Sequence, residues 1–310
     1  MRTLTLLLLA FFLCKVSLAQ KTETVYLNAA DSTKNKYIII YPAKLPWKGC
    51  LFLIPGMFQK AADVLIQTTL PMHAAQQGLL TVIPTFSMGI SSVGIDSASQ
   101  ASLLEIMDHV GKTNKLINEP FYIGGFSIGG SCAIKFAELA LGNNYPIKPV
   151  AVFALDAPLD FERMYTNTLR EIRLPGSGED ALAESKYMQQ VFLKVFGGTP
   201  AEKLVNYYSL SPYSFNDATQ QAIRPLVNLP IRLYTEPDIH WWLKDGVDYS
   251  LMNAFDFAAM TNELKRMGNK KIELIITDTK GYRQPGNIRH PHSWSIAEPK
   301  VLVKWLLNQK

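Results

Sequence analysis

The sequence predicts an α/β fold, with a mostly parallel sheet of eight strands and helices on both of its faces. Short apolar runs alternate with longer segments of helical periodicity, which is the pattern of such a sheet. Several of the runs, such as 37–40 and 272–276, are mostly apolar, as strands buried on both faces are. The chain has 310 residues, of which 48% are hydrophobic, and this is enough for one large core.

Each predicted element follows from one of these two patterns. The eight segments that read as strands are 24–29, 37–41, 50–54, 80–84, 120–124, 149–155, 230–235 and 271–277. The segments of helical period that follow the third and later strands are 61–77, 97–113, 129–141, 249–267 and 298–307. This alternation is expected to leave the strands parallel over most of the sheet.

One long interval interrupts the alternation. About seventy residues separate Asp156 from Pro230, which is too many for a single crossover in a compact domain. Apolar residues recur at helical spacing within it, and glycines separate the helical stretches, which are 160–173, 179–196 and 201–208. We therefore expect one domain over 20–310 with a helical lid inserted at about 157–228.

The first nineteen residues resemble an export signal. Arg2 gives a positive start, residues 4–13 form a short apolar run, and small residues stand at Ser17 and Ala19. This pattern predicts a signal peptide over 1–19, cleaved before Gln20, and a secreted or periplasmic protein without a stable membrane span. The alternative is an uncleaved membrane anchor, for which the apolar run is short.

Charge and cysteine content exclude some classes of partner. The formal net charge is +5, and its Lys and Arg residues are spread along the chain without a basic cluster, so no nucleic acid partner is expected. Beyond the signal, only Cys50 and Cys132 remain. Two cysteines on different elements do not make a disulfide framework, and we expect two buried free thiols.

The segment Gly125-Phe126-Ser127-Ile128-Gly129 is the most informative motif. It matches the G-x-S-x-G pattern, follows an apolar strand and precedes a helix, which is the setting of a nucleophile elbow. Glycines allow strand and helix to pass closely while the serine is held at the turn. The alternative is a glycine-rich turn with a capping serine. Ser127 is the candidate nucleophile.

A serine nucleophile needs a base, and two histidines follow the last predicted strand. His290 and His292 lie in a loop that a parallel sheet brings to the same carboxyl edge as the serine. We expect His292 to be the base because it lies next to Ser293-Trp294, which lead into the last helix, and because Pro291 stiffens the approach, with His290 as the alternative. The two could also bind a metal, but no third ligand stands at a diagnostic spacing, so neither metal nor cofactor is expected.

The base in turn needs a carboxylate, and three acids compete for this role. The strand at 230–235 is followed by Glu236 and Asp238, of which Asp238 is the first choice and Glu236 the second. Asp156, at the end of the sixth strand, is the third candidate. Each of the first two also has a structural interpretation, as an ion-pair partner or as a helix cap.

Backbone N–H groups are expected to stabilise the oxyanion of an acyl-transfer intermediate. One donor is Ile128, the residue after the serine. The other lies in the loop after the third strand, where Gly56 lets the backbone turn inward and Met57 follows. Phe58 is the alternative donor in that loop.

Together these motifs resemble those of the α/β-hydrolase superfamily across nearly all of the chain beyond the signal. The matching features are the Pro55-Gly56 turn, the Ser127 elbow, the strand that leads to Asp238, and the late His292. Two departures are a proline at position 55, where many relatives have histidine, and a long stretch between Asp238 and His292. Some relatives place the acid after the sixth strand, which keeps Asp156 a candidate.

The resemblance implies the α/β-hydrolase fold and a Ser–His–Asp triad that acts through an acyl-enzyme. The expected activity is the hydrolysis of a carboxylic ester, with a small-molecule or peptide-like acyl compound as substrate. A serine peptidase or an acyltransferase would use the same residues. A non-catalytic binding protein on the same scaffold is the remaining alternative.

Overall fold

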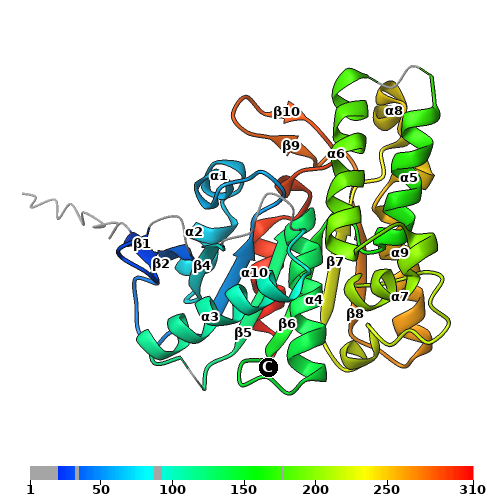
Figure 1. The fold of residues 1–310 in the computed structure, drawn as a ribbon. Helices are drawn as coiled ribbons and strands as arrows, with labels where there is room; N and C mark the ends of the chain where they lie inside the picture. The colour runs from blue at the N-terminus through cyan, green and yellow to red at the C-terminus, as the bar shows by residue number, and fades with distance from the viewer. Residues whose placement is uncertain (1–19, 32–34, 87–92, 117, 176–177, 310) are drawn as a thin grey trace, which may run out of the picture.

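The computed structural model describes residues 20–31, 35–86, 93–116, 118–175 and 178–309. The predicted signal peptide at 1–19 lies outside the described residues. A single eight-stranded sheet, in the order β1-β2-β4-β3-β5-β6-β7-β8, runs through the structure (Figure 1). The pairs β1–β2 and β2–β4 are antiparallel and every later pair is parallel, so the predicted sheet is confirmed. Its strands are β1 (Thr22–Tyr26), β2 (Lys36–Ile40), β3 (Cys50–Ile54), β4 (Leu80–Thr85), β5 (Phe121–Phe126), β6 (Pro149–Leu155), β7 (Ile231–Thr235) and β8 (Ile272–Ile276).

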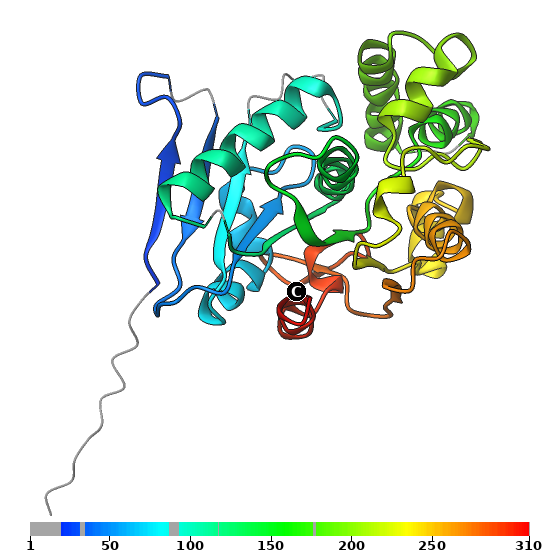
Figure 2. The same cartoon turned by 90° about the horizontal axis from the view of Figure 1, so that it is seen from below.

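The central strands are buried because helices cover both faces of the sheet. Every residue of β3 and of β5 is buried, as their continuous apolar sequences predict. Figure 2 shows α3 and α4 on one side of the strands, with α1, α2 and α10 on the other. The bounds of the covering helices are α1 (Ala61–Gln67), α2 (Leu70–Gln76), α3 (Ser97–Thr113), α4 (Ile128–Gly142), α9 (Ala254–Arg266) and α10 (Pro299–Leu307).

Two predicted helices are shorter than expected. The segment 61–77 is two helices, because Thr68 is extended and a new helix begins at Leu70, with Pro71 in its first turn. The segment 249–267 opens with a 3₁₀ turn, η3 (Tyr249–Leu251), whose start is capped by the Asp248 side chain. Met252 is then extended, so α9 begins only at Ala254.

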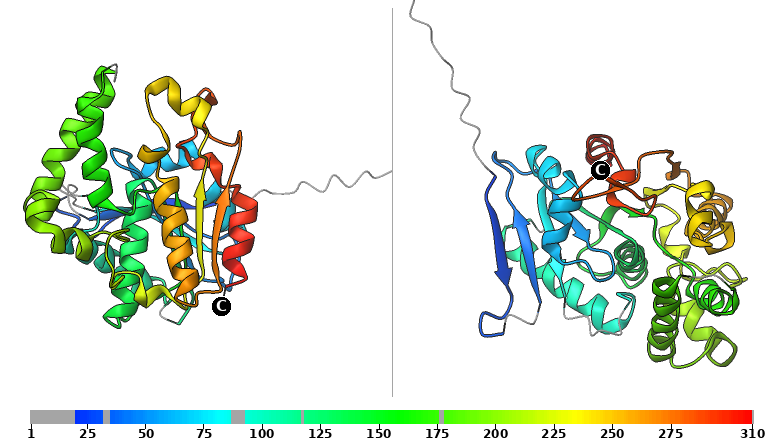
Figure 3. Two further views of the ribbon diagram at one scale, coloured as in Figure 1. Left: turned by 90° about the vertical axis from the view of Figure 1, so that its right-hand side faces the viewer. Right: turned by 90° about the horizontal axis from the view of Figure 1, so that it is seen from above.

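Three helices occupy the predicted insertion between β6 and β7. They are α5 (Phe161–Arg173), α6 (Glu179–Phe196) and α7 (Pro200–Leu210), and they pack around a small separate core to which Val93, Ile95 and Ile128 also contribute. In that core the rings of Phe196 and Tyr207 stack with centroids 4.0 Å apart. The views in Figure 3 place α5 and α6 on the side of the molecule opposite α10. That this insertion acts as a lid stays a prediction.

Short elements beyond β7 were not predicted. The helix α8 (Ile239–Trp242) follows β7, and a hairpin of β9 (Tyr282–Arg283) and β10 (Ile288–Arg289) follows β8. Strands of two residues have no periodicity that a sequence could reveal.

Cys50 and Cys132 are buried free cysteines, as expected. Burial raises the pKa of the Cys132 thiol to about 12. Within the described part of the chain, no helix combines the length and the apolar character that crossing a bilayer requires.

Candidate active site

Ser127 lies at a strained turn between β5 and α4. Its backbone has φ 53° and ψ −132°, a conformation that residues other than glycine rarely adopt. The flanking glycines explain how the turn fits. A Cβ on Gly125 would lie 2.4 Å from the carbonyl group of Gly129, and a Cβ on Gly129 would lie 2.3 Å from the oxygen of Ile54. The predicted strand–turn–helix setting of the serine is therefore present.

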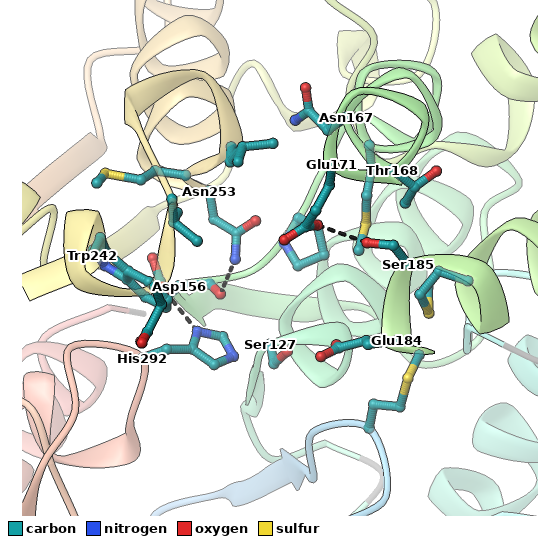
Figure 4. Close-up of a pocket in the computed structure, with 18 of the residues that line it drawn as sticks. Ser127, Asp156, Asn167, Thr168, Glu171, Glu184, Ser185, Trp242, Asn253 and His292 are labelled. Atoms are coloured by element: carbon teal, nitrogen blue, oxygen red, sulfur yellow. Dashed lines mark hydrogen bonds and ion pairs between the residues drawn. The ribbon is translucent and has the colours of Figure 1, made fainter. Parts of the chain in front are cut away.

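The imidazole of His292 lies between a carboxylate and this serine. Its Nδ1 atom is 2.6 Å from Oδ2 of Asp156. Figure 4 shows the ring between the Asp156 side chain and Ser127. All three residues line one pocket of about 980 Å³. The serine, the imidazole and a carboxylate therefore meet at the carboxyl edge of the sheet.

Neighbours on β7 and α9 fix the position of Asp156. It is the residue directly after β6, with φ 43°, and its N–H donates to the carbonyl of Tyr234 at 2.7 Å. Its second carboxylate oxygen accepts from the Thr235 hydroxyl at 2.8 Å, and its own carbonyl accepts from the Asn253 amide at 2.8 Å. Each carboxylate oxygen thus has a partner, and one of them is left to His292.

The expected pairing of His292 with Asp238 is wrong, because Asp238 is bound elsewhere. One of its oxygens accepts from the N–H of Trp241 and so caps the start of α8. The other lies 2.6 Å from Nη2 of Arg289. The chain has already turned into α8 at this point, whereas Asp156 follows its strand directly. The third sequence candidate is therefore the acid that contacts the imidazole.

Glu236, the second candidate, is also occupied by structural contacts. It is 2% exposed and accepts hydrogen bonds from the Thr277 hydroxyl and from the N–H groups of Lys280 and Gly281. Its Oε1 atom, which accepts from Gly281, also lies 2.7 Å from Nη1 of Arg289. Glu236 thus holds the segment between β8 and the hairpin, on the chain that leads to His292.

His290 does not contact an acid. Its Nδ1 accepts the backbone N–H of His292 at 3.2 Å, and its ring packs 4.6 Å from Trp241. Burial, with Arg283 and His292 nearby, lowers the pKa of His290 to about 3. The neutral ring therefore accepts a hydrogen bond from the His292 backbone and lines the same pocket as His292.

The two expected oxyanion donors face the pocket. Met57 and Ile128 both line it, and the backbone N–H of neither donates a hydrogen bond to any other described residue. The preceding residue, Gly56, donates its N–H to the side chain of Gln59. This side chain also accepts from the indole N–H of Trp294, a contact that no pattern in the sequence predicts.

The insertion and the segment after β7 form opposite walls of the pocket. Met164 and Met188 come from α5 and α6, and Trp242 and Met252 lie on the other wall. Charged side chains stand among these apolar ones, and Glu184 of α6 faces the serine in Figure 4. Among the described residues, no three His, Cys, Asp or Glu side chains are grouped so that they could hold a metal ion.

Comparison with known proteins agrees with this architecture. No model of a protein family matches the sequence, and no curated protein matches it. Among solved structures, the chain is similar to carboxyl esterase 2 of the fungus Tuber melanosporum, with 12% identity over 94% of this chain and 86% of that one and a TM-score of 0.59. It is also similar to an S-formylglutathione hydrolase from Agrobacterium tumefaciens, with 14% identity over 94% and 95% and a TM-score of 0.55.

A third similar structure is the Francisella virulence factor BioJ, with 14% identity over 93% of this chain and 83% of that one and a TM-score of 0.55. At such identities the likeness is one of fold. The chain has the α/β-hydrolase fold, as the sequence predicts.

Proposed function

We propose that this protein is an exported serine hydrolase that cleaves a carboxylic ester through an acyl-enzyme. The observation that carries the proposal is the 2.6 Å contact between His292 and Asp156 beside the strained Ser127. A strained serine, an imidazole and an acid in one pocket are the parts that acyl transfer requires.

In the proposed reaction, His292 takes the hydroxyl proton of Ser127 through Nε2 as the serine oxygen attacks the ester carbonyl. Asp156 accepts from Nδ1–H, fixes the tautomer and stabilises the imidazolium that forms. The N–H groups of Met57 and Ile128 donate to the carbonyl oxygen, which becomes negative. His292 then returns the proton to the leaving alcohol as the C–O bond breaks.

Deacylation repeats the sequence with water. His292 removes a proton from a water molecule, whose oxygen attacks the acyl carbonyl. The bond to the serine oxygen then breaks, and the proton goes from His292 to Ser127. The free acid leaves the pocket, and the enzyme is back in its starting state.

The apolar side chains of the pocket support a small-molecule or peptide-like acyl substrate, and the insertion suggests a lid. Thioether and indole groups offer apolar contact area for an acyl or alkyl group. The insertion reaches the loop after β3 that carries Gly56, Met57 and Phe58, which we call the oxyanion loop. The centre of the Phe58 ring lies 5.8 Å from that of Tyr187 in α6. We propose that α5, α6 and α7 limit the entry of water and substrate. Export rests on the N-terminal sequence pattern alone.

Labelling with a fluorophosphonate probe tests the proposal. The mature wild-type chain should be labelled, and Ser127→Ala should remove the label without unfolding the protein. A folded wild type that stays unlabelled would favour the non-catalytic binding protein.

A screen of p-nitrophenyl esters of different acyl lengths, run beside aminoacyl amides, tests the bond that is cleaved. We expect the esters to be hydrolysed faster. Faster cleavage of the amides would favour a peptidase, and transfer of the acyl group to an added alcohol in preference to water would favour an acyltransferase.

A further inference from the structure

Gln59 connects the oxyanion loop to the loop that carries His292. The backbone N–H of Gly56 donates to Oε1 of Gln59 at 3.0 Å, and the indole N–H of Trp294 donates to the same oxygen at 3.1 Å. Both partners are donors only, so the atom between them is the carbonyl oxygen of the amide. We refer to this arrangement, formed by Gly56, Gln59 and Trp294, as the Gln59 bridge.

The elbow packs against the same bridge. The ring of Phe126, which directly precedes Ser127, lies 4.4 Å from the ring of His292 and 5.6 Å from that of Trp294. The Phe126 ring also lies 2.9 Å from the point where a Cβ on Gly56 would stand. The loops that carry the oxyanion donor, the nucleophile and the base therefore meet around one phenyl ring and one amide oxygen.

We propose that Gln59 is a positioning residue for catalysis, which sets the oxyanion donor of Met57 relative to the imidazole of His292. This inference rests on the proposed function. In the transition state one carbonyl group must reach the Met57 N–H while its leaving oxygen receives the proton from His292. Displacement of such groups by about 1 Å costs on the order of 10²-fold in rate. The amide oxygen of Gln59 accepts one hydrogen bond from Gly56, next to the Met57 donor, and one from Trp294, on the loop that carries His292. These two bonds oppose such a displacement.

The role predicts an effect on kcat rather than on KM. Neither Gln59 nor Trp294 lines the pocket, so neither contacts the bound substrate. Loss of the bridge therefore leaves ground-state binding in place and weakens the contacts made in the transition state.

Gln67 provides a control, because its side-chain amide also joins two distant segments and does not line the pocket. Its Oε1 accepts the N–H of Gln284 at 3.0 Å, and its Nε2 donates to the Gln284 carbonyl. This pair joins α1 to the β9–β10 hairpin, and neither residue lines the pocket. Replacing either glutamine with methionine keeps the length of the side chain and removes the amide.

The experiment measures ester hydrolysis and thermal unfolding of wild type, Q59M and Q67M. We expect Q59M to lower kcat about 10- to 30-fold with KM within about threefold, whereas Q67M keeps kcat close to that of wild type. Equal kcat for Q59M and Q67M would overturn the inference. So would a loss in Q59M that lies only in KM.

A double-mutant cycle with Trp294→Phe tests the bridge itself. W294F removes the indole donor, and we expect it to lower kcat several-fold in wild type and to change kcat little in Q59M. If the separate effects of Q59M and W294F on kcat multiply in the double variant, the inference is overturned. If Q59M does not fold, W294F decides alone: a lower kcat at unchanged KM supports the bridge, and an unchanged kcat overturns it.

Wild type separates the two proposals. If it neither hydrolyses esters nor takes the fluorophosphonate label, the proposed function fails and this inference fails with it. If it is active and Q59M is equally active, only the role of Gln59 is lost.

Discussion

The carboxyl ends of β6 and β7 lie next to each other in the sheet, and both are followed by acids that do different work. Asp156 follows β6 directly and contacts His292, whereas Asp238 caps α8 and pairs with Arg289. Glu236, directly after β7, binds the backbone that leads to the histidine loop. The acid after β6 thus contacts the imidazole, whereas the acids after β7 stabilise the segments around the loop that carries it.

The largest effect is expected from Asp156→Asn. The amide cannot stabilise an imidazolium and would favour the wrong tautomer of His292, so kcat should fall on the order of 10³-fold or more. Steady-state ester hydrolysis measures this, with circular dichroism as a check of folding. If kcat of D156N lies within about tenfold of the wild-type value, the acids after β6 and β7 do not differ in the way proposed here.

Glu236→Gln is expected to affect stability most. The variant leaves Arg289 with a weaker partner and weakens bonds to two backbone N–H groups, so the free energy of unfolding should fall by about 2 kcal/mol. Urea denaturation measures this. Glu273→Gln is the control: Glu273 pairs with Arg232, its side chain is 43% exposed, and we expect a loss below about 1 kcal/mol. Equal losses would contradict the structural role of Glu236.

The pH dependence of stability should report on His290. Its pKa is lowered from 6.5 to about 3, so the folded state favours the neutral ring and the unfolded state takes up the proton first. The stability that depends on the neutral His290 ring is fully present above pH 6.5 and is lost as the pH falls from 6.5 toward 3. Over that range the free energy of unfolding falls by at most ~1.4 kcal/mol per pH unit.

His290→Gln should remove that slope. Urea denaturation at about pH 7 and about pH 5 should show wild type losing roughly 1 kcal/mol more than the variant over this interval. Equal losses in both proteins would mean that the ring is as accessible to protons as in the unfolded chain.

The smallest effect is expected from Asp238→Asn. Its ion pair with Arg289 is partly exposed, at 24% and 23%, so stability should change by less than about 1 kcal/mol and kcat by less than about threefold. Kinetics and denaturation of D238N, run beside D156N, measure both. A loss of kcat as large as that of D156N would mean that Asp238 takes part in catalysis.

The sequence carried enough information for the sheet, the serine and the histidine. Continuous apolar runs marked the buried strands, and glycines around Ser127 marked the tight turn. It could not rank the acids, because the carboxylates after β6 and β7 reach the same edge. What separates them is backbone direction: Asp156 turns at φ 43°, while the chain at Asp238 enters a helix.

The contacts between distant loops were beyond the sequence for a similar reason. Gln59 and Trp294 are 235 positions apart, and no periodicity relates them. The β9–β10 hairpin has strands of two residues, too short for a pattern. Pro71, by contrast, was a readable signal that the predicted helix 61–77 divides in two.

The most direct test is the proton NMR signal of the Nδ1–H group of His292, which a hydrogen bond to a carboxylate moves downfield. Spectra of wild type, D156N and D238N are compared, and His292→Gln identifies the resonance by its absence. We expect the downfield signal to persist in D238N and to disappear in D156N. A signal that survives in D156N and is lost in D238N would contradict this expectation.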